Sequence, residues 1–466
     1  MFEKIKQSAL SMFADNNAAL LSLLIIGVDL FGLYAYLGTR LFLLSPVWIF
    51  LSVYGIATLM YLYVGARILP RIPERLKPQA LVYVVILAVA FRFCVLQAPP
   101  SLSTDMYRYV WDGRLIAHGI NPYRWAPNSE TLRFLRDPIW NPLEYKAYQT
   151  IYMSVSEFVF ALGYYLFHEN LIGFKFIYLA FDVALIFVIK AILARLGRDP
   201  LHIFWYAWCP LPIVEISLAG HQDVVGVFLV LLTFLLILNE KSRPYAAVAL
   251  VGATLTKGFA LLLIPMFART YGRRFAVVAV VSLVYLSMPM LVYLPEFMHG
   301  MRQYLDSVNV NSGIFYFLNK WMIHVTRYHY AISHWLCDAI ILSTVTWSCI
   351  KPAESAIDLL RKTFIILSIT LLAVPTLFPW YLLWILPFMG LISQRPIWAL
   401  LMFSGLVGLL YTYYVYKMPL LWVPYAEYVP FYLLLTYEYR TWVRDRKNDE
   451  PKDQKRVLSV SEHLPL

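Results

Sequence analysis

A short polar segment after the third apolar run of the chain carries the residues best suited to chemistry. Asp105 stands just beyond that run, and Arg108 and Arg114 follow it within three helical turns. A carboxylate can take a proton from a hydroxyl, and guanidinium groups can hold an anion such as a phosphate. The set therefore suits a transfer reaction in which a phosphate leaves. The alternative is a group of surface ion pairs, which is the commoner fate of loop charges.

A second polar group, Gly220-His221-Gln222-Asp223, interrupts the apolar sequence between two further runs. His221 could donate a hydrogen bond to a phosphate or a hydroxyl, and Asp223 could orient the imidazole or accept a sugar hydroxyl. The alternative is a polar turn in which Asp223 caps a helix that begins near Val224. Both interpretations can hold at once.

Lys257 lies inside an otherwise apolar stretch. A lysine at the centre of a membrane helix costs about 2.5 to 3.5 kcal/mol on insertion scales, so a function or a partner is expected for it. A lipid phosphate would be a fitting partner, and snorkelling to the interface is the alternative. Arg92 is also a charged residue within an apolar run, so a function or a partner is expected for it too. Its side chain could also reach the headgroups.

Several carboxyl groups also fall within or beside apolar runs. Proton-driven transporters place acids in this way, but here the acids are scattered without matching positions in two halves. We expect them to pair with hydroxyl groups, Arg or Lys between helices, or to be held neutral. These residues are Asp29, Glu157, Asp182 and Glu215.

The elements that must position these groups are membrane helices. Of 466 residues, 60% are hydrophobic and 14% charged, and the mean hydropathy is +0.63, which excludes an ordinary soluble enzyme. The net charge of +11 comes mostly from basic residues in short loops, where they set topology, so nucleic acid is not an expected partner. The four cysteines show neither zinc nor disulfide spacing.

The apolar runs predict an all-α polytopic protein with about 10 to 14 transmembrane helices. The first three runs cover residues 18–37, 47–66 and 80–97, and the second and third are separated by four basic residues that place both this loop and the N-terminus in the cytoplasm. Residues 98–150 then form a long first extracytoplasmic loop. We expect one transmembrane domain, 1–443, and a disordered cytoplasmic tail, 444–466.

Two stretches do not fit simple crossings. Residues 151–167 are apolar but short, which predicts an interfacial or re-entrant helix. Residues 245–268 begin and end beside basic residues, which predicts a pair of half-helices with Lys257 at the apex. Near the end of the chain, Pro379-Trp380-Tyr381 and Trp384 predict a broken helix end whose aromatic side chains could line a lipid groove.

The run from Thr104 to Arg114 (TDMYRYVWDGR), with Gly119-Ile120-Asn121-Pro122-Tyr123, resembles the first extracytoplasmic loop of GT-C fold membrane glycosyltransferases. The resemblance is greatest to prokaryotic polyprenyl-phosphate-mannose-dependent mannosyltransferases. The group at residues 220–223, the break at Lys257 and Phe378-Pro379-Trp380-Tyr381 resemble later points in those chains. The resemblance implies that Asp105 is the general base and that mannose moves from a lipid phosphate with inversion. Many relatives have two adjacent acids where Met106 follows Asp105 here, so no metal and no cofactor is expected.

These observations give a specific expectation for the site. Arg108, Arg114, Lys257 and His221 are expected to bind the donor phosphate, and Asp112, Tyr123 and Asp223 to contact the sugar or the acceptor. The expected partners are a polyprenyl-phosphate sugar, a lipid or glycan acceptor and membrane lipids, and the expected location is the bacterial plasma membrane. A secondary transporter or lipid-linked sugar flippase, and a polysaccharide polymerase or ligase, are the alternatives.

Overall fold

The computed structural model describes residues 2–40, 43, 46–239, 242–393, 397–416 and 421–449, and within these ranges it contains helices and turns without a β-strand. The predicted all-α class is confirmed. The α-helices are α1 (Phe2–Gly38), α2 (Val47–Tyr63), α3 (Lys77–Val95), α4 (Asp105–Ala117), α5 (Ser154–Phe167), α6 (Leu171–Arg195), α7 (Phe204–Ala207), α8 (Pro210–Pro212), α9 (Asp223–Ile237), α10 (Arg243–Thr254), α11 (Ile264–Leu291), α12 (Leu294–Ser307), α13 (Ile314–Met322), α14 (His329–Ile350), α15 (Ala356–Ala373), α16 (Trp398–Leu406), α17 (Tyr411–Tyr416) and α18 (Val423–Asp449).

Short 3-10 and π-helical turns connect or extend many of these helices. They are η1 (Val64–Ile68), η2 (Leu69–Arg71), η3 (Glu74–Leu76), η4 (Glu130–Leu135), η5 (Pro200–Ile203), η6 (Ile213–Leu218), η8 (Gly258–Leu263), η9 (Pro379–Trp384), η10 (Leu386–Gly390) and η11 (Val407–Leu410). The predicted tail begins inside α18, which continues to Asp449, and residues 450–466 lie outside the described part of the chain.

The protein is an integral membrane protein. Five helices of the described residues are long and apolar enough to cross a membrane, or six if the bent pair Pro200–Ala207 and Pro210–Leu218 is one span. The five are Asn17–Gly38, Val47–Arg71, Glu74–Val95, Leu171–Arg195 and Gly258–Leu291. By length and apolar character, the described helices give fewer spans than the predicted 10 to 14. The reason is that proline and 3-10 turns divide many apolar runs into helices shorter than a bilayer requires.

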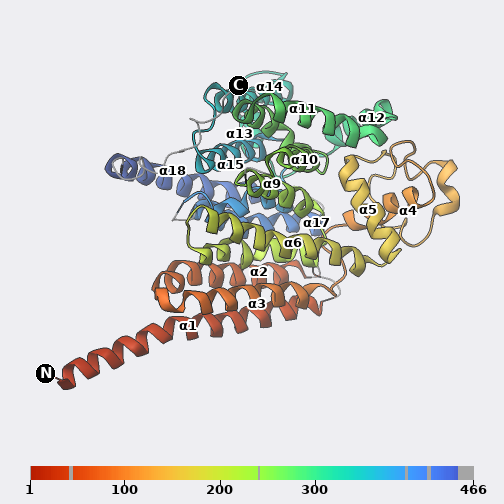
Figure 1. Ribbon diagram of the computed structural model, residues 1–466. Coiled ribbons are helices and arrows are strands. Elements are labelled where there is room, and N and C mark those ends of the chain that lie inside the picture. Colours follow the sequence, from red (N-terminus) through yellow and green to blue (C-terminus); the bar gives the residue numbers. More distant parts are fainter. Residues whose placement is uncertain are drawn as a thin grey trace.

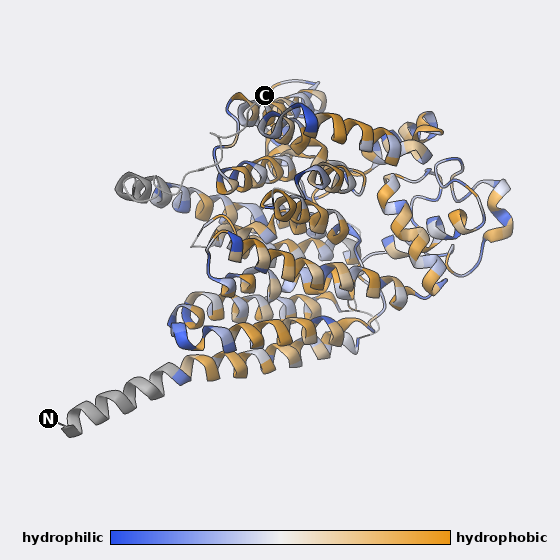
Figure 2. Ribbon diagram, viewed as in Figure 1, coloured by the Kyte–Doolittle hydropathy of each residue, from blue (hydrophilic) through white to orange (hydrophobic). Residues whose placement is uncertain are grey.

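The helices lie roughly parallel in a layered bundle (Figure 1). Helices α1, α2 and α3 pack side by side, α6 packs on α9, and α9 packs on α10. Helices α4, α5 and α12 project at one end of this bundle, opposite the side from which α1 begins. Most of the bundle is apolar, and hydrophilic residues gather at the turn between α2 and α3 (Figure 2). The loop predicted to be extracytoplasmic is thus at the end away from the basic turn.

A buried ion pair holds the centre of the bundle. The guanidinium of Arg92 donates to both carboxylate oxygens of Asp182, over 2.6 and 3.3 Å, and both side chains are fully buried. Tyr206 also donates to Asp182 over 2.6 Å, and Arg92 reaches the backbone oxygen of Ala207 over 2.7 Å. The predicted pairing of Asp182 with a basic residue is confirmed. The pair joins α3 and α6 to the bent segment around α7.

A second buried cation links the two segments that lead into the polar end of the bundle. Lys175 of α6 donates to the backbone oxygens of Leu96, over 3.4 Å, and Ala98, over 2.6 Å, just after α3, and also to that of Leu218 at the end of η6. Cations are favourable at helix C-termini, where carbonyl groups lack partners within the helix. Lys175 therefore fixes the chain just before Asp105 and just before Gly220.

The two irregular stretches also have their explanation in the fold. Helix α5 has 14 residues and packs against α4, so it is too short to span a bilayer. Helix α10 ends at Thr254, and Lys257 is extended, with φ −157° and ψ 131°, before η8 begins. The predicted break at Lys257 is therefore present. After η8 the chain continues into α11, which is kinked at Gly272.

Candidate functional site

Asp105 is the first residue of α4 and stands at the projecting end of the bundle. The Asp105 backbone N–H donates to the Ser103 hydroxyl over 3.2 Å, and the Asp105 side chain remains 35% exposed. The pKa of Asp105 is raised to about 7, mainly by desolvation and also by the charges of Glu144 and Asp223, against the opposing effect of Lys257. The side chain can therefore exchange a proton near neutral pH while it stays accessible to a substrate.

The start of α4 packs directly on the turn that precedes α9. Gly220 has φ +83°, a backbone conformation that favours glycine, and the Met106 side chain occupies the space beside it. This turn follows the π-helical η6, whose Glu215 carbonyl accepts the His221 backbone N–H over 2.9 Å. The contact brings the polar group at residues 220–223 next to Asp105.

His221 lies between two carboxyl groups. Its Nδ1 atom is 3.7 Å from Oδ2 of Asp105, and its Nε2 atom is 3.5 Å from Oε2 of Glu215. The ring is 1% exposed and stacks on Trp380, with 3.7 Å between the ring centroids and 15° between the planes. Burial, with a contribution from the charge of Lys257, holds the pKa of His221 well below its usual value. The imidazole is therefore neutral.

Lys257 and Asp223 form an ion pair beside this histidine. The Lys257 ammonium donates to Oδ1 of Asp223 over 2.7 Å, and the Trp384 indole N–H donates to the same oxygen over 3.0 Å. Asp223 is the first residue of α9 and is 1% exposed, whereas Lys257 is 22% exposed. Burial lowers the pKa of Lys257, and the Asp223 carboxylate opposes this shift. Because Lys257 is partly exposed, a ligand can reach its ammonium group.

Aromatic side chains of η9 form one wall of the site. The Lys257 ammonium lies 3.8 Å from the centroid of the Tyr381 ring, which is a favourable cation–π distance. Trp380 stacks on Phe378 at 4.5 Å, on the other side from His221. The predicted broken helix at residues 379–384 is thus a 3-10 turn whose rings contact His221, Asp223 and Lys257.

Two of the expected phosphate-binding residues are engaged elsewhere. Arg108 donates from Nε to both oxygens of Asp112, over 2.9 Å each. Arg114 donates over 2.7 Å to Asp137 and to Glu169, and it is 3% exposed. Arg108 is thus paired within α4, whereas Arg114 joins α4 to the loop and to the segment just before α6.

The two remaining residues expected at the sugar are buried in the packing around α4. Asp112 is fully buried, and desolvation raises its pKa, against the effect of Arg108. Tyr123 is also fully buried, and its hydroxyl donates to the Tyr152 backbone oxygen over 3.0 Å. The structure therefore brings Asp105, His221, Asp223 and Lys257 together, and it places Asp112 and Tyr123 behind them.

The described side chains of the site do not form a metal-binding group. Within the described ranges, no group of three or more His, Cys, Asp or Glu side chains could hold a metal ion. Around Asp105, His221 lies between the Asp105 and Glu215 carboxyl groups, and Lys257 pairs with Asp223.

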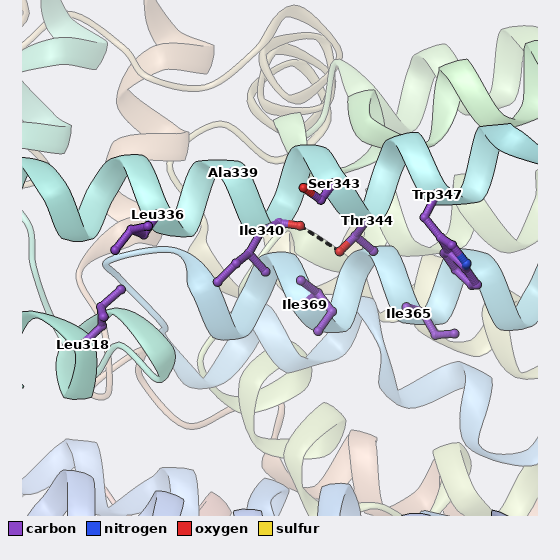
Figure 3. A pocket seen from close by; sticks show the side chains of 9 residues that line it. All are labelled: Leu318, Leu336, Ala339, Ile340, Ser343, Thr344, Trp347, Ile365 and Ile369. Carbon is purple, nitrogen blue, oxygen red and sulfur yellow. Dashed lines mark hydrogen bonds between the residues drawn. The ribbon is translucent and has the colours of Figure 1, made fainter.

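An apolar groove lies between α14 and α15, with one residue from α13 (Figure 3). Its two hydroxyl side chains are Ser343 and Thr344, and Thr344 donates to the Ile340 backbone oxygen of its own helix over 2.8 Å. The groove contains no charged residue and none of the candidate site residues. It suits hydrocarbon rather than a headgroup.

The sequence indicated neither of two contacts at the site. Glu215 was one of several scattered acids, and its distance to His221 depends on the turn at Gly220. Trp384 was expected to face lipid, but it donates to Asp223 across 161 residues of sequence. The only signal for Glu215 was its position six residues before His221 within an apolar run.

An accessible carboxylate and an accessible lysine at the ends of apolar helices form a charged site in a helical membrane protein. The model of the family described as alpha-(1->6)-mannopyranosyltransferase, N-terminal domain, matches residues 30–273, which is more than half of the chain. The chain belongs to this family and is a glycosyltransferase that moves mannose, as the resemblance of its first loop implied. No curated protein and no solved structure matches it. The family match does not favour a secondary transporter or lipid-linked sugar flippase. It does not favour a polysaccharide polymerase or ligase either.

Proposed function

We propose that this protein transfers mannose from a polyprenyl-phosphate-linked donor to a hydroxyl group of a lipid or glycan acceptor, on the extracytoplasmic face of a bacterial plasma membrane. The observation that carries the proposal is that Asp105 and the Lys257–Asp223 ion pair lie on either side of the turn at His221, against the start of α4. Helix α4 projects at the end of the bundle away from the basic turn between α2 and α3. Basic turns favour the cytoplasm, so this polar end faces outward, and both termini face inward.

In this mechanism Asp105 takes the proton of the acceptor hydroxyl as its oxygen attacks the anomeric carbon. The bond from that carbon to the phosphate oxygen breaks on the opposite face of the sugar, so the configuration inverts. Negative charge grows on the leaving phosphate, and the Lys257 ammonium, already held by Asp223 and Tyr381, stabilises it there. The polyprenyl phosphate leaves as an anion, so no second acid is required.

The proposal assigns the donor phosphate to Lys257 rather than to all four expected cations. Arg108 and Arg114 are already paired with carboxylates, and removing either from its acids would leave a buried charge without its partner. His221 is neutral and buried between Asp105 and Glu215, so it carries no charge toward an anion. Asp223 holds the lysine in position.

The test is transfer by the purified protein. We expect labelled polyprenyl phosphate mannose, incubated with the protein and a membrane lipid extract, to give a new labelled glycolipid. Asp105→Asn should abolish transfer and keep the thermal unfolding midpoint. Asp306→Asn, which changes an exposed acid of α12, is the matched control and should keep full activity. Retained turnover by Asp105→Asn would exclude Asp105 as the base, and transfer from a nucleotide sugar alone would exclude the lipid donor.

A further inference from the structure

Glu215 is a buried acid whose two oxygens have different surroundings. Its side chain is 1% exposed and lies in the apolar segment η6. Oε1 accepts the hydroxyl of Tyr411 over 2.7 Å, whereas Oε2 faces Nε2 of His221 over 3.5 Å. Among the described residues, no lysine or arginine forms an ion pair with Glu215. An ionised carboxylate without a cation is costly in such surroundings, so the neutral acid is favoured.

The protonation of Glu215 decides where His221 carries its hydrogen. The neutral acid presents Oε1 to the Tyr411 hydroxyl and its own O–H, on Oε2, to His221. Nε2 then accepts this hydrogen bond, and the single hydrogen of the neutral imidazole must be on Nδ1. Nδ1 faces Oδ2 of Asp105 over 3.7 Å, and no other hydrogen-bond partner within the described residues reaches either ring nitrogen.

We propose that Glu215 and His221 are positioning residues that direct an N–H at Asp105, so that the base is held in its ionised form and in a fixed orientation. This inference rests on the proposed role of Asp105 as base. It adds a donor chain, from Glu215 through His221 to Asp105, in which every group is neutral except the final carboxylate. Trp380 stacks on the ring of His221 and so restricts the orientation of the imidazole.

The two gaps of 3.7 and 3.5 Å are longer than hydrogen bonds, and a small rotation of the ring with a shift of Asp105 closes them. Catalytic hydrogen bonds often tighten when substrate fills a site. The chain does not carry the substrate proton away. That proton ends on the Asp105 oxygen that does not face His221, and it leaves to water through the exposed part of Asp105.

Other ionisable groups also face Asp105 and must be held constant in a test. They come from the loop, from α4, from the turn before η8, from α9, from α12 and from η9, and they are Glu144, Tyr145, Tyr152, Tyr109, Lys257, Asp223, Tyr304 and Tyr381. None of the variants below alters these side chains. A change in the titration of Asp105 in those variants therefore reports on the donor chain.

The experiment compares two substitutions of Glu215 in the purified full-length protein. Glu215→Gln keeps a donor, because its amide N–H can replace the acid O–H while its oxygen still accepts from Tyr411, so near-normal transfer is expected. Glu215→Leu removes the donor. We expect the pH at which its kcat/KM rises to move up by about one unit. Since Asp105 is then mostly protonated at pH 7, the rate at that pH should fall roughly fivefold.

Glu427→Gln is the matched control, since Glu427 is another fully buried acid and accepts from Asn311 over 2.7 Å far along the chain. In Glu427→Gln, the pH at which kcat/KM rises should be the same as in the native protein. Two results would contradict the donor chain: a loss of activity in Glu215→Gln as large as that in Glu215→Leu, or an unchanged pH dependence of kcat/KM in Glu215→Leu. Either result would still allow Asp105 to be the base. Activity of Asp105→Asn would instead overturn the proposed function itself.

A second measurement does not depend on how the variants fold. Nitrogen NMR of the native protein labelled at histidine, with the His221 signal assigned by its loss in His221→Gln, reports which ring nitrogen carries hydrogen. We expect the hydrogen on Nδ1. A hydrogen on Nε2 in the native protein would mean that Glu215 accepts rather than donates, and it would overturn the proposal.

Discussion

Met106 and Gly220 are packed so closely that the methionine side chain fills the space where a Cβ atom at residue 220 would lie. This contact sets the candidate base of α4 against the turn that carries His221. Gly220 also has φ +83°, where a side chain is strained. The relative position of two segments more than 100 residues apart in sequence thus depends on the absence of one side chain.

Gly220→Ala is expected to displace the start of α4 and to reduce mannose transfer by at least about tenfold, because small misplacements of catalytic groups are costly. The control is Gly119→Ala, since Gly119 has φ +71° but open space around its Cα. That variant should lose about 1 to 2 kcal/mol of stability from backbone strain alone and keep transfer. Equal activity losses in the two variants would contradict the packing argument.

Replacement of Lys257 tests the binding of the donor phosphate. Lys257→Met removes the accessible cation and one of the donors to Asp223, whereas the Trp384 donor remains. We therefore expect KM for the lipid donor to rise and kcat to fall. Lys257→Arg should restore part of the activity. Steady-state kinetics against donor concentration give both constants. Lys320→Met, at an exposed site of α13, should change neither; an unaltered KM in Lys257→Met would remove Lys257 from the donor site.

The rate should depend on pH through Asp105. Its pKa is raised from 3.8 to about 7, so the carboxyl is protonated and inactive as a base below that pH, and kcat/KM should rise as pH increases through about 7. This rise can be measured as kcat/KM for transfer by the native protein between about pH 5 and pH 9, at saturating acceptor. A rate that stays constant down to pH 5 would mean that the ionisation of Asp105 does not limit the reaction.

The Arg92 and Asp182 pair predicts a strong coupling in stability. Removing one partner leaves a buried charge unpaired, so Arg92→Met alone is expected to cost about 3 to 5 kcal/mol. The double variant Arg92→Met with Asp182→Asn should recover a substantial part of that loss. Thermal unfolding in lipid nanodiscs measures both. If the double variant is as unstable as the sum of the two single variants, the pair makes no coupled contribution.

The polar points of the site could be predicted because each one interrupts an apolar run. A charged residue is costly inside a membrane helix, so Asp105, His221 and Lys257 are conspicuous in the sequence. The basic turns also indicated that these interruptions share one side of the membrane. The structure brings the same residues together at one end of the bundle.

The partners of the loop arginines could not be predicted in this way. Arg114 pairs with Asp137 and Glu169, which lie in irregular or capping segments without any period that relates them to α4. Phosphate binding and an internal ion pair require the same guanidinium group, so residue type alone does not separate them. The number of crossings was equally hard to predict, because an apolar run does not show where proline or a 3-10 turn will break the helix.

The aromatic wall formed by η9 comes from outside the part of the chain that matches the mannosyltransferase family, residues 30–273. Asp105, His221, Asp223 and Lys257 all lie within that part. The charged groups of the site and one wall of it are thus supplied by different parts of the chain. A chimera that takes residues 379–384 from another member of the family should therefore retain the reaction only where the exchanged segment restores the ring contacts to His221, Lys257 and Asp223.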